Sequence, residues 1–186
     1  MEAALPALAP DDAAMSRVAA GDTAALATLF DLHKARLFGF LFHQVGDRAL
    51  AEDLLGETFL RVYESRSRFR AGSGFTPWLY TIARNLAIRE LRRKGVIERA
   101  QGRLMRDAEP EPDPWDPERE EQRRQVRLAL LALPEEQRSA IVLKEYSGLS
   151  YREIAQVLRC SEEAARARTY RARGTLREAL RDWWEE

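Results

Sequence analysis

Apolar residues recur at spacings of three and four along most of the chain, which is the spacing of one face of an α-helix. In residues 22–45 this face consists of Leu26, Leu29, Phe30, His33, Leu37, Phe40 and Leu41. Asp22 can cap this first helix, and Asp47 can cap a second helix that runs to about residue 65. Pro77 suits the first turn of a third helix, which we expect to end near residue 94. Because no segment shows strand-like alternation, residues 21–94 predict a bundle of three or four helices.

The helical periodicity begins again near residue 118 and predicts a second helical unit. Pro134 ends one helix and begins the next, because proline cannot continue a helix but is tolerated in its first turn. Ser150 and Glu153 have the spacing of a capping box at the start of a short helix, and Ser161 can cap a final helix to about residue 182. We therefore predict an all-α fold of two small domains, the second a four-helix unit.

Composition divides the chain further. Residues 1–20 begin with an Ala/Pro-rich stretch and are predicted to be a disordered extension. Residues 95–120 contain the sequence EPEPDPWDP, which is acidic and interrupted by prolines, and we expect a flexible linker there. The predicted domains are therefore residues 21–94 and residues 121–186.

The formal net charge of the 186 residues is zero, but the charge is unevenly distributed. An acidic run at residues 107–121 offsets two basic clusters, one ending at Lys94 and one in residues 166–177, so a polyanionic partner is not excluded. Cys160 is the only cysteine, which rules out an intramolecular disulfide and a multi-cysteine zinc site within one chain. We found no signal peptide and no apolar run of membrane-spanning length, so we expect a cytoplasmic protein that does not insert into membranes.

Residues 69–94 read FRAGSGFTPWLYTIARNLAIRELRRK and combine a glycine-punctuated loop, several aromatic residues and a basic helix end. Aromatic rings stack on unpaired bases and cations neutralise phosphates, so this stretch is a candidate site for nucleic acid that is not fully paired. Taken alone, it fits a packed helix with a solvated basic end better. The rest of the chain decides between the two interpretations.

A short capped helix, a tight turn and an Arg-rich helix in residues 150–182 follow the plan of a helix-turn-helix. A helical wheel places Ala165, Thr169 and Ala172 on the face that packs against the preceding helix. The residues that such a helix would present to base edges are Ser161, Glu162, Glu163 and Arg166, since the N-terminal end of a recognition helix enters the major groove. Arg168, Arg171 and Arg173 are expected to contact phosphates. The alternative is a solvated arginine face on a bundle helix.

Three segments, AEDLLGETFLRVY, FTPWLYTIARNLAIRELRR and LPEEQRSAIVLKEYSGLSYREIAQVL, follow one another in the order and spacing typical of one family. With them the chain resembles the extracytoplasmic-function sigma factors, a two-domain group of bacterial transcription initiation factors. The resemblance covers about residues 24–94 and 133–178. It implies a non-enzymatic protein without cofactor or metal, whose partners are core RNA polymerase, promoter DNA and an anti-sigma factor.

The resemblance also implies a role for individual residues. Contact with the clamp helices of the polymerase β′ subunit falls on Asp53, Leu54, Glu57, Thr58, Leu60 and Arg61, and contact with the β flap on Ile141 and Tyr146. Recognition and melting of the −10 element fall on Phe69, Arg70, Phe75, Trp78, Tyr80, Arg84, Asn85, Ile88, Arg89 and Arg92, with the loop at residues 70–76 capturing an extruded base. Recognition of the −35 element falls on Ser161, Glu162, Glu163, Arg166, Arg168, Tyr170, Arg171 and Arg173. The acidic linker would pass near the path of the nascent RNA.

The sequence departs from the family pattern at two places. Gly56 stands where a longer polar residue is usual, which puts the strength of that polymerase contact in question. The segment SEEAARAR opens the last helix with Ala164 and Ala165, which lack the hydroxyl and the volume of the usual residues. Specificity for the −35 element is therefore the weakest of the implied properties.

Two other functions remain to be weighed. A DNA-binding regulator that never engages polymerase would share the helix-turn-helix but leave residues 24–94 without a purpose. A metal enzyme could be built on His33, His43, Asp47 and Glu52, but their spacing is not that of a helical ligand pair. Absence of co-elution with core polymerase would favour the DNA-binding regulator over a sigma factor. Stoichiometric metal in a metal assay would favour the metal enzyme.

Overall fold

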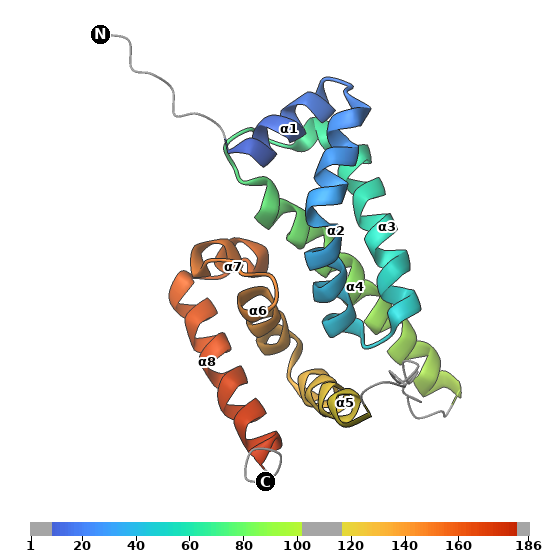
Figure 1. The fold of residues 1–186 in the computed structure, drawn as a ribbon, viewed down its shortest axis with the longest axis vertical. Coiled ribbons are helices and arrows are strands. Elements are labelled where there is room, and N and C mark those ends of the chain that lie inside the picture. Colours follow the sequence, from blue (N-terminus) through green and yellow to red (C-terminus); the bar gives the residue numbers. More distant parts are fainter. Residues whose placement is uncertain (1–8, 102–116, 182–186) are drawn as a thin grey trace.

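The computed structural model describes residues 9–101 and 117–181, and within these ranges all regular structure is helical (Figure 1). The helices are α1 (Pro10–Ala19), α2 (Thr23–Val45), α3 (Arg48–Glu64), η1 (Arg66–Arg68, a 3₁₀ turn), α4 (Phe75–Gln101), α5 (Pro117–Ala132), α6 (Glu135–Glu145), α7 (Tyr151–Leu158) and α8 (Glu162–Ala179). Helices α1–α4 form one bundle and α5–α8 form a second (Figure 1). The predicted all-α fold with a four-helix second unit is confirmed.

The predicted caps set the boundaries of the N-terminal bundle. The Asp22 carboxylate accepts a hydrogen bond from the Ala25 N–H at 3.1 Å, and the Asp47 carboxylate accepts one from the Leu50 N–H at 3.0 Å. Between the two helices Gly46 has a φ of 73°, a left-handed conformation that glycine adopts without steric cost. The core that these helices enclose includes Leu29, Leu37, Phe40, Leu41, Leu54, Val62, Leu79, Ala83 and Ala87.

The first helix corrects the predicted disordered extension at residues 1–20. Residues 1–8 lie outside the described part of the chain, but Pro10–Ala19 form α1, which packs on α2. Met15 and Val18, one turn apart, are fully buried there. Pro10 in the first turn and the acidic residues that follow it favour the start of a helix, so local sequence and tertiary burial together order this segment.

The predicted linker at residues 95–120 is also shorter than expected. Helix α4 continues to Gln101 rather than ending near residue 94, because no proline interrupts residues 95–101. Helix α5 begins at Pro117, which occupies the first helical position, where its missing N–H is not needed. Residues 102–116, the rest of the predicted linker, lie outside the described residues.

Two local features define the C-terminal bundle. Ser150 and Glu153 form the predicted capping box at the start of α7, with the Ser150 N–H donating to the Glu153 carboxylate at 2.8 Å. Arg159 ends α7 in the left-handed conformation, with a φ of 51°, and Ser161 then caps α8. This strained residue fits the sharp turn between the two helices, so the helix-turn-helix plan is present in the backbone.

The two bundles pack against each other, with α7 in contact with α4, and α5 and α6 in contact with α2 (Figure 1). Their interface contains a buried polar layer. The Ser139 hydroxyl donates to the Gln44 side-chain oxygen at 3.2 Å, and the Arg138 guanidinium lies 3.5 Å from the same oxygen. At the edge of this layer the Arg84 guanidinium forms an ion pair with Glu135 at 2.8 Å. The linker is therefore not the only connection between the domains in this arrangement.

Candidate nucleic-acid interface

The glycine-punctuated loop between η1 and α4 is a tight turn with two glycines in the left-handed region. Gly72 and Gly74 have φ values of 84° and 88°, which side-chain-bearing residues rarely adopt. The Ser73 N–H and hydroxyl both donate to the Arg70 carbonyl, at 3.0 and 2.7 Å. A side chain at position 74 would in addition approach Pro77 to 3.0 Å. The loop therefore forms a tight turn that delivers its aromatic flanks to one place.

Three aromatic rings gather beside this loop. The ring centroid of Phe69 lies 5.2 Å from that of Trp78 and 6.2 Å from that of Phe75. Phe69 and Trp78 are partly exposed, and Arg70 is exposed next to them. These groups form a surface on which an unpaired base can stack, with a cation within one residue of it.

Two predicted −10 residues need correction, because their rings are in the core. Phe75 and Tyr80 are each 1% exposed. Tyr80 packs edge to face on Phe40, at 5.2 Å between centroids, and Phe75 packs in the same way on His33, at 5.3 Å. In this arrangement neither ring is free to stack on a base, and both instead support the residues that are.

Helix α4 carries the predicted readers on its outer side. Asn85, Arg89 and Arg92 are exposed, and Ile88 is partly buried beside them. Arg84 differs, because its ion pair with Glu135 and its contact with Ser139 leave only 14% of the side chain exposed. Asn85 is therefore open to a base edge, whereas Arg84 is engaged by the second domain.

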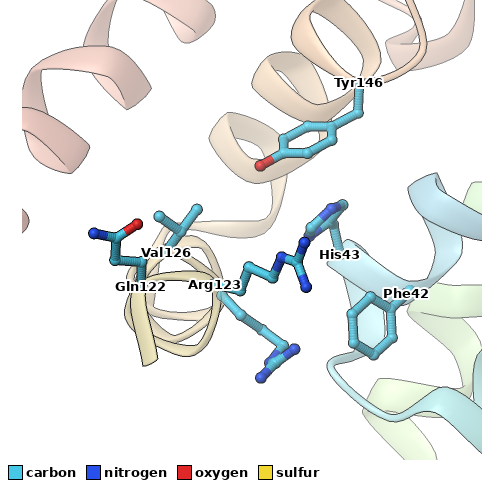
Figure 2. Close-up of a pocket in the computed structure, with 7 residues that line it drawn as sticks. Phe42, His43, Gln122, Arg123, Val126 and Tyr146 are labelled. Carbon is cyan, nitrogen blue, oxygen red and sulfur yellow. The ribbon is translucent and has the colours of Figure 1, made fainter. Parts of the chain in front are cut away.

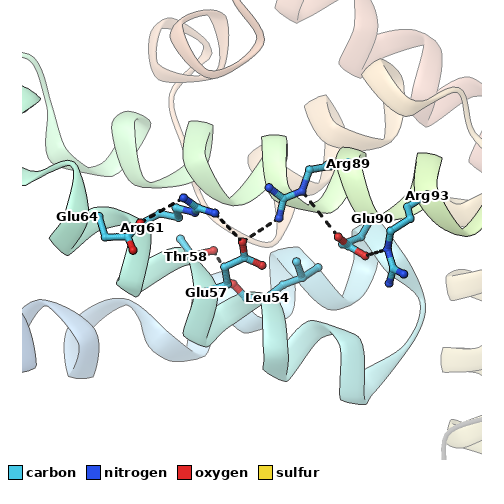
Figure 3. A network of polar contacts seen from close by, with 8 residues as sticks. All are labelled: Leu54, Glu57, Thr58, Arg61, Glu64, Arg89, Glu90 and Arg93. Carbon is cyan, nitrogen blue, oxygen red and sulfur yellow. Dashed lines mark hydrogen bonds and ion pairs between the residues drawn. The ribbon is translucent and has the colours of Figure 1, made fainter.

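A chain of ion pairs joins α3 to α4 (Figure 3). The Glu57 carboxylate lies 2.8 Å from Arg89 and 3.5 Å from Arg61, and Glu90 lies 2.7 Å from Arg93. A residue predicted to contact polymerase and a residue predicted to contact DNA thus pair with each other. The arginines of these pairs are 49–61% exposed, although Glu90 is only 15% exposed. Each pair therefore contributes at most about 1 kcal/mol and is readily exchanged for another partner.

The predicted polymerase surface on α3 is only partly available. Asp53 and Arg61 are exposed, and Leu60 is 55% exposed although apolar. Leu54 and Thr58, in contrast, are buried, and the Thr58 hydroxyl donates to the Leu54 carbonyl within the helix at 2.6 Å. These two residues face the bundle core, which corrects their assignment as direct contacts.

Helix α8 presents its basic flank to solvent. Its buried face consists of Ala165, Thr169 and Ala172, as the helical wheel predicts. The predicted −35 contacts that are exposed are Ser161, Glu162, Glu163, Arg166, Tyr170, Arg171 and Arg173, with Tyr170 79% exposed. The small side chains allow α8 to pack closely on α6 and α7, so Ala165 does not prevent the helix from seating.

Three arginines of α8 have protein partners. Arg166 pairs with Glu162 at 2.7 Å, and its guanidinium lies 4.5 Å from the centre of the Tyr151 ring. Arg173 pairs with Glu145. Arg168 is turned inward and pairs with Glu136 of α6 at 2.8 Å, with only 20% of its side chain exposed. Its assignment as a phosphate contact is therefore corrected to a contact between helices, whereas Arg166 remains at the surface.

An open groove of about 620 Å³ lies where the two domains meet (Figure 2). It is lined by Phe42, His43, Gln122, Arg123, Val126, Arg127 and Tyr146. Tyr146 is 46% exposed and its ring centroid lies 4.0 Å from that of His43, whereas Ile141, the other predicted flap contact, is 4% exposed and belongs to the core. Burial, and secondarily the nearby Arg127 cation, lower the pKa of His43 from 6.5 to about 4.

The histidines do not form a metal site with the other proposed ligands. His33 pairs with Asp11 at 2.9 Å, and in the part of the chain that the structure describes no group of three or more potential ligands is close enough to hold a metal ion. In the same ranges, no helix is both long and apolar enough to cross a membrane.

The two helical domains, one with exposed aromatic rings next to a tight loop and the other with an exposed helix-turn-helix, are typical of a DNA-binding protein. The chain matches the family models for sigma-70 region 2 at residues 29–96 and sigma-70 region 4 at residues 123–176. It is 40% identical over 168 residues to the RNA polymerase sigma factor CarQ of Myxococcus xanthus, covering 89% of this chain and 95% of the relative. It is 34% identical over 173 residues to the ECF RNA polymerase sigma-E factor of Haemophilus influenzae, covering 88% and 91%.

A solved structure gives the same result. The sigma factor RpoE of Bartonella quintana, in complex with the anti-sigma factor NepR, superposes with a TM-score of 0.73 at 27% identity, covering 83% of this chain and 96% of that one. The chain therefore belongs to the extracytoplasmic-function group of the sigma-70 family. It is an alternative sigma factor for transcription initiation, and the regulator that does not engage polymerase is not favoured.

Two sets of residues that support the candidate sites could not be recognised from the sequence motifs. Asp12, on α1, is 2% exposed and accepts hydrogen bonds from the loop between η1 and α4. Gln44, Glu135 and Ser139 form the polar layer between the domains. Both sets join segments far apart in the chain, so helical periodicity could not reveal them.

Proposed function

We propose that this sigma factor opens promoters with the N-terminal domain and anchors them with the C-terminal domain. The observation that carries the proposal is the contact between Phe69 and Trp78, two partly exposed rings, with the exposed amide of Asn85 seven residues, or about two turns, farther along the same helix as Trp78. A base that leaves the duplex must be compensated for a few kcal/mol of lost stacking and pairing. Stacking on the rings supplies that energy, and the loop at residues 70–76 encloses the base.

Basic side chains of the loop and of α4 complete the proposed −10 surface. Arg70, Arg89 and Arg92 are exposed and neutralise the phosphates of the strand, while Asn85 reads a base edge with its donor and acceptor. The pair between Arg89 and Glu57 is exchanged for DNA when the promoter binds, since both side chains are partly in solvent. Arg84 joins this surface only when Glu135 and Ser139 have moved away.

Helix α8 is the proposed −35 reader. Ser161, Glu162 and Arg166 are exposed at its N-terminal end, which is the end that enters the major groove in this motif. Tyr170, Arg171 and Arg173 lie farther along the helix and suit contacts to the backbone.

Replacing Arg166 by alanine is expected to weaken binding to the preferred −35 sequence by about 1–3 kcal/mol, the value of one bidentate base contact. The loss should be small on sequences that lack that base. Competition binding against a panel of single-base −35 variants measures it, with Arg171→Ala as the matched control for a phosphate contact. A uniform loss across the panel would identify Arg166 as a phosphate contact instead.

Core polymerase is proposed to bind at Asp53, Leu60 and Arg61 on α3, an exposed apolar side chain flanked by charges, and at Tyr146 on the second domain. An anti-sigma factor is a further proposed partner. The Bartonella relative forms such a complex, and its similarity to this chain over both domains supports an equivalent complex here.

Run-off transcription with purified core polymerase on a library of promoter fragments tests the function as a whole. We expect specific transcripts that depend on the protein, and their upstream sequences should share one element near −10 and one near −35. A parallel sizing column should show co-elution with core polymerase. Absence of both transcripts and co-elution would refute polymerase engagement.

A further inference from the structure

A buried carboxylate on α1 holds the loop that the proposed function assigns to base capture. One oxygen of Asp12 accepts hydrogen bonds from the N–H groups of Gly72, at 2.8 Å, and Gly74, at 3.2 Å. The other accepts from the N–H of Phe75, the first residue of α4, at 2.6 Å. Asp12 is 2% exposed, so these bonds are shielded from water. Three amides of one loop therefore converge on a single charged group from a segment about 60 residues earlier.

The position of Asp12 is itself fixed by the N-terminal bundle. Met15 and Val18 of α1 are fully buried, and the Ser16 hydroxyl donates to the Asp12 carbonyl at 2.8 Å. The neighbouring Asp11 pairs with His33 of α2 at 2.9 Å, and the His33 ring packs on Phe75. Helix α1 thus contacts the start of α4 through two adjacent acidic residues. Asp12 binds the loop amides directly, and Asp11 acts through His33.

The physical consequence is preorganisation. Gly72 and Gly74 have positive φ values and would be conformationally free in a solvated loop, and ordering such residues during binding costs free energy. Hydrogen bonds to a charged acceptor are stronger than those to a neutral one, so Asp12 orders the loop before DNA arrives. A site whose groups are already in place binds and reacts faster than one that must assemble.

We infer that Asp12 is a positioning residue for promoter opening, which holds the loop at residues 70–76 in the shape that receives the extruded −10 base. This inference rests on the proposed base-capture function of that loop. Asp12 does not touch DNA itself, because its carboxylate is enclosed by the loop amides. The inference therefore gives α1 a part in promoter opening without direct contact to DNA.

Asp12→Asn is the test, because asparagine keeps the shape but removes the charge and directs an N–H₂ group at the loop amides. With the full chain in holoenzyme, we expect the rate of promoter opening to fall at least tenfold, measured by permanganate reactivity or 2-aminopurine fluorescence in the −10 element. Affinity for the closed complex should stay within twofold, since α8 is unaffected. Hydrogen exchange should show faster exchange at residues 72–75 and unchanged protection in α2 and α3.

Two control variants separate positioning from general loosening. Val18→Ala weakens the packing of α1 without touching the loop, and Asp11→Asn removes the pair with His33 while leaving the three amide bonds. Both control variants should open promoters at close to the normal rate. The inference is overturned if Asp12→Asn opens promoters no more slowly than Val18→Ala when the two variants have equal thermal stability.

A parallel measurement on Trp78→Ala shows whether a negative result concerns the role of Asp12 alone or the proposed base capture on which that role depends. Normal opening by Asp12→Asn together with slow opening by Trp78→Ala overturns the role of Asp12 alone. Normal opening by both variants overturns base capture by this surface, and the role of Asp12 with it.

Discussion

Replacing Trp78 by alanine is expected to slow promoter opening by roughly tenfold to a hundredfold while leaving closed-complex binding nearly unchanged. The indole is partly exposed and packs on Phe69 at 5.2 Å between centroids, so it can accept a stacked base without rearrangement of its neighbours. Stacking of one base on an aromatic side chain contributes about 1–3 kcal/mol. Permanganate footprinting of the −10 element measures opening, and gel-shift or anisotropy assays measure the closed complex.

Trp78 also packs inside its own domain, so a matched control is needed. Tyr63 on α3 is also a partly exposed aromatic residue, and its ring faces the Arg66 guanidinium at 4.1 Å. Tyr63→Ala should lower thermal stability by a comparable amount without a specific effect on opening. If Trp78→Ala opens promoters normally, or if both variants slow opening equally, the stacking role of Trp78 is refuted.

The features that the sequence predicts well are those with a local cause. The caps at Asp22, Asp47, Ser150 and Ser161 depend on side chains within three residues of the amide they satisfy, and all four form. Helix α1 was not predicted, because its burial rests on Met15 and Val18 and on contacts with α2 rather than on a long apolar stripe. Its order is a tertiary effect.

Within the candidate sites, residue type alone did not reveal which way a side chain points. Tyr80 is aromatic and lies beside the loop, but it shares a helix face with the buried Ala83 and Ala87, and the three- and four-residue spacing predicts its burial. Arg168 likewise lies three residues after Ala165 and four before Ala172, on the packed face of α8. The bonds from Asp12 to the loop join distant segments and leave no such periodic signal.

The arrangement of the domains has a consequence for promoter binding. Elements centred near −10 and −35 are separated by about 25 base pairs, or roughly 85 Å of B-form DNA at 3.4 Å per base pair. Here α4 contacts α7, and Arg84 of the −10 surface is bound to Glu135 of the second domain. We therefore expect the polar layer at Gln44, Arg138 and Ser139 to separate when the proposed −10 and −35 surfaces engage a promoter.

Acidification from pH 7 to about 4.5 is expected to favour separation of the two domains, through His43. The pKa of His43 is about 4 in the closed arrangement, because the imidazole is buried, with Arg127 nearby as the second cause, and 6.5 is its ordinary value once solvent reaches it. Since the closed-state pKa is the lower one, the open state takes up a proton first. The closed state therefore keeps its full stability above pH 6.5, loses about 1.4 kcal/mol by pH 5.5, and loses about 3 kcal/mol in total as the pH falls to 4.

The radius of gyration from small-angle X-ray scattering, recorded against pH at constant salt, measures this opening. His43 faces Tyr146 of α6, and Arg123 and Arg127 of α5 line the same groove, so separation of the bundles exposes its ring. His43→Gln cannot titrate and should flatten the transition between pH 6.5 and 4. His33→Gln alters the other histidine, which lies within the first bundle, and should leave the pH transition unchanged. An identical pH dependence in the wild-type protein and His43→Gln would assign the transition to other groups and refute the role of His43.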